Sequence, residues 1–272
     1  MAADLPPSAS TAAPGAGAAH GGAAGAIPLP PGSVPPPPGD ELVILVDRAL
    51  DPRVVVAHEP QSGVAEQYRT FRANLVALNP GGQPRALAVT SAIKGEGKSV
   101  TVANLAVALA ELPDTRVLVV DADLRSPSQH QLFGRPREPG LADAMLDFVP
   151  IERVVAATSL PSLYVLSAGR AVRNSSELLG SSRMSDLIGA LKAEFQWILF
   201  DTPPALPFAD AATLGTRVDG LLYVVRLEKT PRDQSTRALE LLRNAGCNVL
   251  GSFLAGARSD DGDVRSYVVP ED

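Results

Sequence analysis

Apolar residues first recur with helical spacing between positions 64 and 78. Their separations alternate between four and three residues, which places them in one stripe along a helix. The residues of this stripe are Val64, Tyr68, Phe71, Leu75 and Leu78. Three charged residues fall on the opposite side of the same helix, where we expect them to face solvent: Glu66, Arg69 and Arg72.

Beyond position 84 the pattern changes to short apolar runs that alternate with helical stretches. Strands are predicted at 85–90, 116–121, 163–167, 197–201, 220–226 and 249–254. Helices are predicted at 99–112, 140–147, 177–195 and 231–245, the last with Thr230 as its N-cap and Pro231 in its first turn. Nearly continuous apolar strands separated by helices indicate an α/β fold, with a mostly parallel sheet and helices on both faces.

Composition divides the chain into three parts. Residues 1–40 are dominated by Ala, Gly and Pro, which cannot bury enough apolar surface to offset the entropy of ordering. We therefore predict a disordered arm at 1–40, one folded domain at 41–256 and a flexible tail at 257–272.

Charge and cysteine content exclude several classes of protein. The 272 residues carry a net charge of −6, which argues against a general nucleic-acid surface. The single cysteine, Cys247, excludes an intramolecular disulfide and is compatible with a reducing cytosol. No run approaches the roughly 20 apolar residues of a membrane span, and the N-terminus lacks a secretion signal. His20, His58 and His130 show no metal-ligand spacing. These features predict a cytoplasmic protein.

The most specific motif occupies residues 92–99, Ala-Ile-Lys-Gly-Glu-Gly-Lys-Ser, between a predicted strand and a predicted helix. A P-loop has this setting, and Gly95 and Gly97 would let its backbone curl around phosphates. Lys98 would reach the β- and γ-phosphates, and the Ser99 hydroxyl would bind Mg²⁺. The predicted nucleotide-binding residues are Gly95, Glu96, Gly97, Lys98, Ser99 and Val100.

Two acidic segments support a magnesium phosphate site. Asp121 and Asp123 follow the apolar run 117–120, and Asp201 follows the run 197–200. Ligands bind at the carboxyl ends of strands in open α/β sheets, which is where these carboxylates would lie. A single Asp after a strand is more often a turn or helix cap, but the P-loop and both acidic segments suit one common site.

These motifs together resemble the bacterial tyrosine kinases (BY-kinases) of capsule and exopolysaccharide biosynthesis, P-loop relatives of the Min/Par ATPases. Val-Asp-Ala-Asp-Leu-Arg at 120–125 resembles the family's Walker A′ motif, and Phe-Asp-Thr-Pro-Pro at 200–204 resembles its Walker B motif. The spacing of Glu66, Arg69 and Arg72 matches the family's Glu-x-x-Arg-x-x-Arg oligomerisation motif. The resemblance spans about residues 51–254.

The resemblance implies an autophosphorylating kinase that transfers the γ-phosphoryl group of ATP to tyrosine. It places Lys98, Asp121 and Asp123 in catalysis and assigns Mg²⁺ to Ser99, Asp121 and Asp201. It implies a homo-oligomer formed through Glu66, Arg69 and Arg72. It also implies activation by a separate membrane polysaccharide co-polymerase, which would recruit the chain to the inner face of the plasma membrane. No nucleic-acid partner is expected.

The chain departs from the family pattern at three positions. Lys94 replaces a common Pro of the P-loop. Tyr267 is the one tyrosine after position 254, where relatives carry a tyrosine cluster, and it is the candidate phospho-acceptor. Ala255 stands where relatives have an Asn that contacts the base, so adenine recognition would differ. The remaining tyrosines are predicted to be core residues: Tyr68, Tyr164 and Tyr223.

Two alternatives to an active kinase remain open. The chain could be a nucleotide-dependent regulator that docks on the co-polymerase without phosphorylating it, as Ala255 and the absent tyrosine cluster suggest. It could also be a partition-type ATPase. Those proteins use a second lysine five residues before the P-loop lysine, and that position holds Ile93, which counts against the partition reading.

Overall fold

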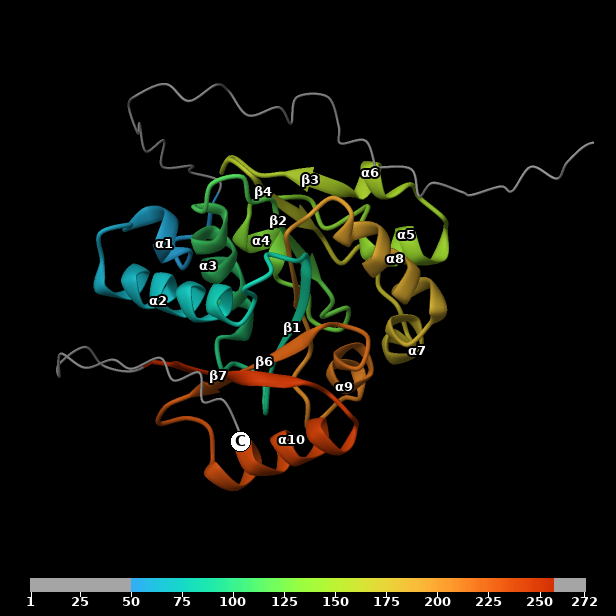
Figure 1. The fold of residues 1–272 in the computed structure, drawn as a ribbon. Coiled ribbons are helices and arrows are strands. Elements are labelled where there is room, and N and C mark those ends of the chain that lie inside the picture. Colours follow the sequence, from blue (N-terminus) through green and yellow to red (C-terminus); the bar gives the residue numbers. More distant parts are fainter. Residues whose placement is uncertain (1–49, 257–272) are drawn as a thin grey trace, which may run out of the picture.

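A seven-stranded sheet organises the computed structural model, which describes residues 50–256 (Figure 1). The strand order is β3-β4-β2-β5-β1-β6-β7. All neighbouring strands pair in parallel except β3, which is antiparallel to β4 at one edge. The strands are β1 (Arg85–Ser91), β2 (Val117–Asp121), β3 (Val155–Ala157), β4 (Leu163–Leu166), β5 (Trp197–Asp201), β6 (Gly220–Arg226) and β7 (Val249–Ala255).

Ten helices connect these strands within the described residues, and all carry the labels of Figure 1. They are α1 (Val55–His58), α2 (Gly63–Ala77), α3 (Lys98–Ala110), α4 (Gln129–Leu132), α5 (Leu141–Leu146), α6 (Ile151–Val154), α7 (Ser175–Leu179), α8 (Ser182–Lys192), α9 (Asp210–Gly215) and α10 (Arg232–Asn244). None of the helices between residues 50 and 256 is long and apolar enough to cross a membrane. The predicted arm at 1–40 and tail at 257–272 lie outside the described residues.

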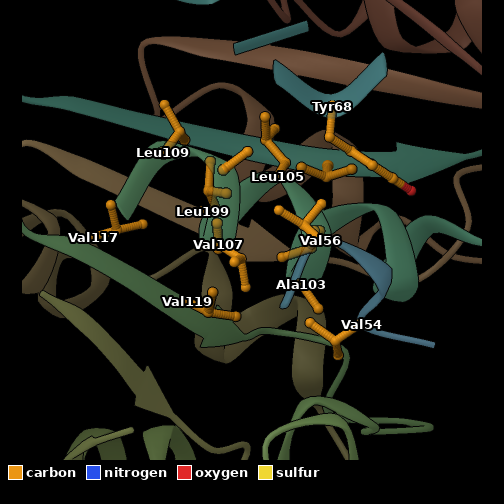
Figure 2. Close-up of a cluster of buried hydrophobic side chains, with 14 of the residues drawn as sticks. Val54, Val56, Tyr68, Ala103, Leu105, Val107, Leu109, Val117, Val119 and Leu199 are labelled. Carbon is orange, nitrogen blue, oxygen red and sulfur yellow. The ribbon is translucent and has the colours of Figure 1, made fainter. Parts of the chain in front are cut away.

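The sheet is covered on both faces, which confirms the predicted fold class. Alternate strand residues, on one face of the sheet, pack against α1, α2 and α3. Helix α3 is buried along most of its length. Figure 2 shows this layer, with Leu105, Val107 and Leu109 of α3 beside Val119 of β2 and Leu199 of β5. Strand residues of the other parity pack against the helices of the opposite face, chiefly α5, α8, α9 and α10.

All six predicted strands are present, whereas the short edge strand β3 was not predicted. The predicted helix at 177–195 is wrong, because two helices, α7 and α8, stand there. Ser181 adopts an extended conformation between them, and its side chain accepts a hydrogen bond from the backbone N–H of Met184 as the N-cap of α8. This local cap competes successfully with a continuous helix.

The predicted start of α10 is also corrected. Pro231, not Thr230, is the N-cap residue. The Thr230 hydroxyl instead donates a hydrogen bond to the carboxylate of Glu96 in the P-loop. The Thr230 side chain therefore bonds to a buried carboxylate distant in sequence and does not cap α10, as its local preference would predict.

Helix α2 follows the predicted apolar stripe only in its middle. Tyr68, Phe71 and Leu75 are buried. The ring centroids of Tyr68 and Phe71 each lie 5.1 Å from that of Phe253 in β7, the first ring stacked on it and the second tilted. The stripe residues at the two ends, Val64 and Leu78, are 44% and 43% exposed. The end positions extend past the neighbouring helix and strand, so periodicity alone overestimates the buried length.

Arg69 and Arg72 do not face solvent as predicted. Both guanidinium groups bind the carboxylate of Glu111 at the C-terminal end of α3, each at 2.8 Å, and Arg72 also donates to the Ala108 carbonyl. Glu66 does face solvent, since its side chain is 71% exposed. The arginines point away from the α2 stripe, but α3 passes close enough to receive them.

Candidate functional site

The P-loop joins β1 to α3 at the carboxyl edge of the sheet. Gly95 and Gly97 have φ angles of 84° and 93°, and Gly97 is the N-cap residue of α3. Residues with a β-carbon rarely adopt these angles, so the two glycines permit the sharp turn into the helix. The turn leaves the N-terminus of a long helix next to the loop, which favours binding of anions.

Glu96 supports the loop from inside the protein. Its side chain is fully buried and accepts hydrogen bonds from the backbone N–H of Ile93, at 2.6 Å, and from the hydroxyl of Thr230. Lys229 donates a further bond to the Gly95 carbonyl, at 2.9 Å. The Glu96 carboxylate is therefore engaged in the protein, and only its backbone is available to a nucleotide.

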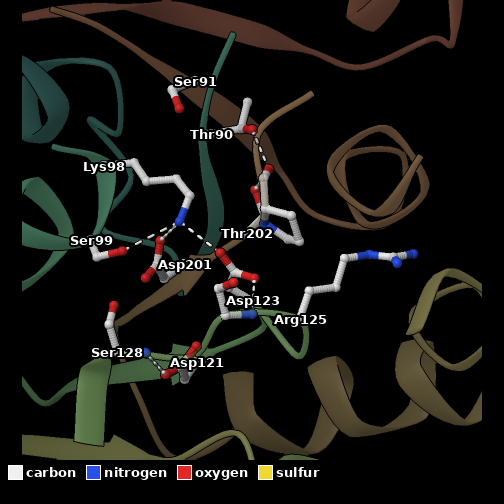
Figure 3. A network of polar contacts seen from close by, with 12 residues as sticks. Thr90, Ser91, Lys98, Ser99, Asp121, Asp123, Arg125, Ser128, Asp201 and Thr202 are labelled. Atoms are coloured by element: carbon white, nitrogen blue, oxygen red, sulfur yellow. Dashed lines mark hydrogen bonds and ion pairs between the residues drawn. The ribbon is translucent and has the colours of Figure 1, made fainter. Parts of the chain in front are cut away.

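Lys98 lies among the acidic residues that the sequence singled out (Figure 3). Its Nζ is 2.8 Å from Asp123 Oδ2, 3.5 Å from Asp201 Oδ1 and 3.3 Å from Ser99 Oγ. Burial lowers the pKa of Lys98, but the carboxylates of Asp201 and Asp123 outweigh it and hold that pKa above its usual value. The ammonium group is therefore charged and positioned to exchange a carboxylate for phosphate oxygens.

Asp121 lies beside Asp201 in the register of β2 and β5, and both side chains are fully buried. Asp121 Oδ2 accepts hydrogen bonds from the backbone N–H groups of Ser128 and Gln129, each at 2.9 Å, while its Oδ1 has no partner. Burial, reinforced by the charge of Asp201, raises the pKa of Asp121 to about 8. A buried carboxyl with an unpaired oxygen is suited to receive a cation.

The oxygen donors present here fit a magnesium ion. Asp121, Asp201 and the Ser99 hydroxyl are hard oxygen ligands of the kind that Mg²⁺ binds. Between residues 50 and 256 no group of three or more His, Cys, Asp or Glu could hold a metal on its own. Mg²⁺ typically takes few protein ligands and completes its shell with phosphate oxygens and water, so the partial set agrees with a metal–nucleotide complex.

Gln129 orders the acidic cluster, and the sequence analysis did not identify it. Its side-chain amide donates to Asp201 Oδ2 at 2.9 Å and to the Ser99 carbonyl at 3.0 Å. It thereby ties the end of β5 to the first turn of α3. No motif marks this residue; its position eight residues after Asp121 becomes meaningful only when α4 folds back over the strand ends.

A second ion pair extends the site away from Lys98. Arg125 reaches Asp210 at the start of α9, with Nη2 3.1 Å from Oδ2, and its guanidinium lies 4.2 Å from the centre of the Phe208 ring. Asp210 is fully buried and also accepts hydrogen bonds from the hydroxyls of Ser175 and Ser176. Arg125 stands in the Walker A′ segment, which could have drawn attention to it, whereas nothing in the sequence marks Asp210.

The structure brings most, though not all, of the predicted site residues together. Val100 follows Ser99 in the first turn of α3. Ala255, at the end of β7, lies 3.9 Å from where a β-carbon on Gly97 would stand, so its position does border the P-loop. The candidate acceptor Tyr267 lies outside the described residues. The other tyrosines are buried core residues as predicted: Tyr68, Tyr164 and Tyr223.

Comparisons with known proteins show which family this chain resembles. The family model described as AAA domain matches residues 85–232. The tyrosine-protein kinase YwqD of Bacillus subtilis (strain 168) is 38% identical over 205 residues, which cover 75% of this chain and 86% of YwqD.

Two solved structures have folds similar to that of this chain, a kinase domain and a MinD protein. The kinase domain of the Escherichia coli tyrosine kinase ETK is 28% identical with a TM-score of 0.73, covering 79% of this chain and 84% of that domain. The septum site-determining protein MinD of Pyrococcus horikoshii OT3, complexed with Mg-ADP, is 25% identical with a TM-score of 0.54, covering 63% and 70%. This chain carries an AAA domain and belongs to the family of bacterial tyrosine-protein kinases.

Proposed function

We propose that this protein is an autophosphorylating tyrosine kinase that uses Mg-ATP and regulates the polymerisation and export of a capsule or exopolysaccharide. The observation that carries the proposal is the position of Lys98, held by Asp123 and Asp201 and next to Asp121, at the start of the P-loop helix. This arrangement joins one buried cation to three carboxylates, as a site for phosphoryl transfer requires.

Each residue would have a separate role in transfer. Gly95, Gly97 and the first turn of α3 bind the phosphates, and Lys98 neutralises the oxygens of the β- and γ-phosphates. Ser99, Asp121 and Asp201 would hold Mg²⁺, which when bound neutralises charge that develops on the transferred group. When Lys98 moves from Asp123 to the phosphates, the Asp123 carboxylate becomes available to accept the proton of the tyrosine hydroxyl.

Assembly into a homo-oligomer through α2 is part of the proposal. Glu66 has a largely exposed side chain whose one ion pair within residues 50–256, to Arg69, is 3.5 Å long, so it can contact a neighbouring subunit. Arg69 and Arg72 are bound to Glu111 and would have to share or exchange that partner. Activation by a membrane co-polymerase at the inner face of the membrane rests on the family resemblance alone.

Two observations bear on the alternatives. Ala255 beside the P-loop offers no polar group to a base, which favours a regulator with altered nucleotide recognition as the second candidate. A partition-type ATPase is disfavoured because Ile93, in the place of that group's second lysine, packs partly buried against the core cluster of β6 and α10. The higher TM-score with the ETK kinase domain than with MinD points the same way.

The test is phosphosite mapping by mass spectrometry after incubation of the full chain with Mg-ATP. Wild type and Lys98→Met are compared, each with and without the cytoplasmic segment of a co-polymerase encoded nearby. Phosphate on Tyr267 or on a partner tyrosine, in wild type only, supports the kinase. Mg-ATP binding without any phosphotyrosine would favour the regulator instead.

A further inference from the structure

A groove with a volume of about 460 Å³ opens between α5 and α7, outside the phosphate site. Four of its lining residues are apolar, and two are arginines from the loop that follows β4. The lining residues are Leu146, Arg170, Ala171, Val172, Arg173, Asn174 and Leu178. None of them has a role in binding nucleotide.

Within residues 50–256, one arginine of the groove is paired with carboxylates, and the other is not. Arg170 pairs with Asp147 at 2.9 Å and lies 3.9 Å from Asp143, and 44% of its side chain is exposed. Arg173 is exposed and makes no ion pair within the part of the chain that the structure describes. The nearest other acid on α7, Glu177, accepts a hydrogen bond from Asn174. Exposed pairs of this kind exchange at little cost, so both arginines can receive an external carboxylate.

Three side-chain contacts, together with short stretches of chain, link the groove to the phosphate site. Arg173 precedes Ser175 by two residues, and Ser175 donates to the buried carboxylate of Asp210. Asp210 pairs with Arg125, which stands two residues after Asp123, the partner of Lys98. Both places lie at the carboxyl edge of the same sheet, with the groove beyond β4 and Lys98 after β1.

We propose that this groove binds the carboxylates that follow Tyr267 and so directs that tyrosine to the phosphate site. The inference rests on the proposed kinase function. Val268 and Val269 match the apolar lining residues, and Glu271 and Asp272 match the two arginines. The segment 257–272 carries five carboxylates and two arginines, so its charge complements the groove.

The spacing of this segment agrees with the architecture. Strands β1 and β4 are three positions apart in the sheet, which is roughly 14 Å between their axes. Four residues of extended chain, the interval from Tyr267 to Glu271, span up to about 14 Å. The interval from Tyr267 to the acidic pair is therefore as long as the separation of the two strands whose ends carry the phosphate site and the groove.

The experiment measures binding of a fluorescent peptide with the sequence of residues 257–272 by anisotropy, without ATP. The protein is the full chain carrying Glu271→Gln and Asp272→Asn, so that its own segment competes weakly. We expect Arg173→Glu to weaken binding about tenfold, and a peptide with the same two neutralising substitutions to lose about as much. The matched control is Arg237→Glu, a charge reversal at an exposed position of α10, which should leave binding unchanged.

Equal effects of Arg173→Glu and Arg237→Glu on peptide affinity would contradict the proposed docking, because only the overall charge of the protein would then matter. So would an unchanged affinity of the neutralised peptide. Partial recovery of Arg173→Glu by a peptide with Glu271→Lys and Asp272→Lys would establish direct contact. Groove-dependent binding without phosphate on Tyr267 or on any partner tyrosine in Mg-ATP would contradict the kinase and leave the docking groove in place.

Discussion

Two clusters of charged side chains, the phosphate site and the α2–α3 contact, differ chiefly in burial. In the phosphate site Asp121 and Asp201 are fully buried, and Lys98 is the cation that compensates them. In the α2–α3 contact Arg69 and Arg72 share Glu111, whose side chain is 33% exposed. Desolvation makes the first cluster costly unless a ligand completes it, whereas solvent screens the second.

Burial therefore distinguishes the reactive phosphate site from the α2–α3 contact, although both are made of acidic and basic side chains. A buried carboxyl whose pKa is raised to about 8 and whose Oδ1 lacks a partner gains most from a bound cation. A partly exposed arginine pair gains little from any single new partner. Four substitutions and one change of pH test the comparison, beginning with the largest expected effect.

Lys98→Met should lower the rate of tyrosine phosphorylation by about a thousandfold or more, because it removes the buried cation that faces the transferred phosphate. The measurement is the initial rate of phosphate incorporation with saturating Mg-ATP. Lys192→Met is the matched control, since Lys192 also pairs with an aspartate, Asp219, at 2.6 Å. It lies at the C-terminal end of α8, away from the P-loop, and should leave the rate nearly unchanged. A rate for Lys98→Met within tenfold of wild type would contradict the assigned role.

Mg²⁺ binding should become stronger as pH rises toward 8 and level off above it. The pKa of Asp121 is raised by burial to about 8, so at lower pH the carboxyl must lose a proton before it can bind the metal. We expect an affinity change of up to about tenfold per pH unit and release of a proton on binding. Calorimetry of Mg-ATP binding in two buffers of different ionisation enthalpy measures both.

The same group should also affect folding. Because the folded pKa lies above the unfolded value of 3.8, the unfolded state loses its proton first as pH rises from about 4 to 8. Asp121 therefore lowers the stability of the metal-free protein across that interval. Asp121→Asn should remove both this pH dependence of stability and the proton release on Mg-ATP binding. Proton release that persists in Asp121→Asn would assign the titration to another group.

Thr230→Val should destabilise the protein by about 1–3 kcal/mol, because the buried carboxylate of Glu96 loses one of its hydrogen-bond donors. Urea unfolding measures this cost, and nucleotide affinity should fall with it as the P-loop loses its support. Thr236→Val is the control, because among the described residues its exposed hydroxyl on α10 bonds only to the Arg232 carbonyl of the same helix. Equal losses of unfolding free energy in the two variants would mean that the hydrogen bond to Glu96 stabilises the protein no more than an exposed one.

Arg72→Ala should have the smallest effect on folding, about 1 kcal/mol or less, because its ion pair with Glu111 is partly exposed. Sedimentation velocity should nevertheless show a lower oligomeric mass if α2 forms the subunit interface. Arg53→Ala, which removes an exposed pair with Asp51, serves as the control and should change neither quantity. An unaltered mass for Arg72→Ala together with a large loss of stability would make the residue purely structural.

Local pattern predicted most of the fold correctly. The central strands β1, β2, β4 and β5 are buried and largely apolar, so their positions follow from residue type, and the P-loop follows from Gly95 and Gly97 before Lys98. The family resemblance, resting on the P-loop and the two acidic segments, is confirmed by the comparisons. The predicted roles of the individual site residues stay predictions, as do the domain boundaries.

Most errors of the sequence-based prediction occur where a side chain contacts a residue distant in sequence. Thr230 bonds to Glu96 instead of capping α10, and Arg69 and Arg72 bind Glu111 instead of facing water. A helix also breaks at Ser181, where a local cap is more favourable than continuity. Windowed periodicity cannot represent contacts between residues that lie tens of positions apart.

The amino-acid sequence by itself determined the alternation of strands and helices and the P-loop with its acidic companions, because these depend on residue type and spacing over a few positions. Only the tertiary structure decided the protonation and partners of those residues. Pairing of β2 with β5 places Asp121 against Asp201 in a region without solvent, and folding of α4 over them adds Gln129. Burial and charge proximity are properties of the assembled chain, and they set both the pKa of Asp121 and the position of Lys98.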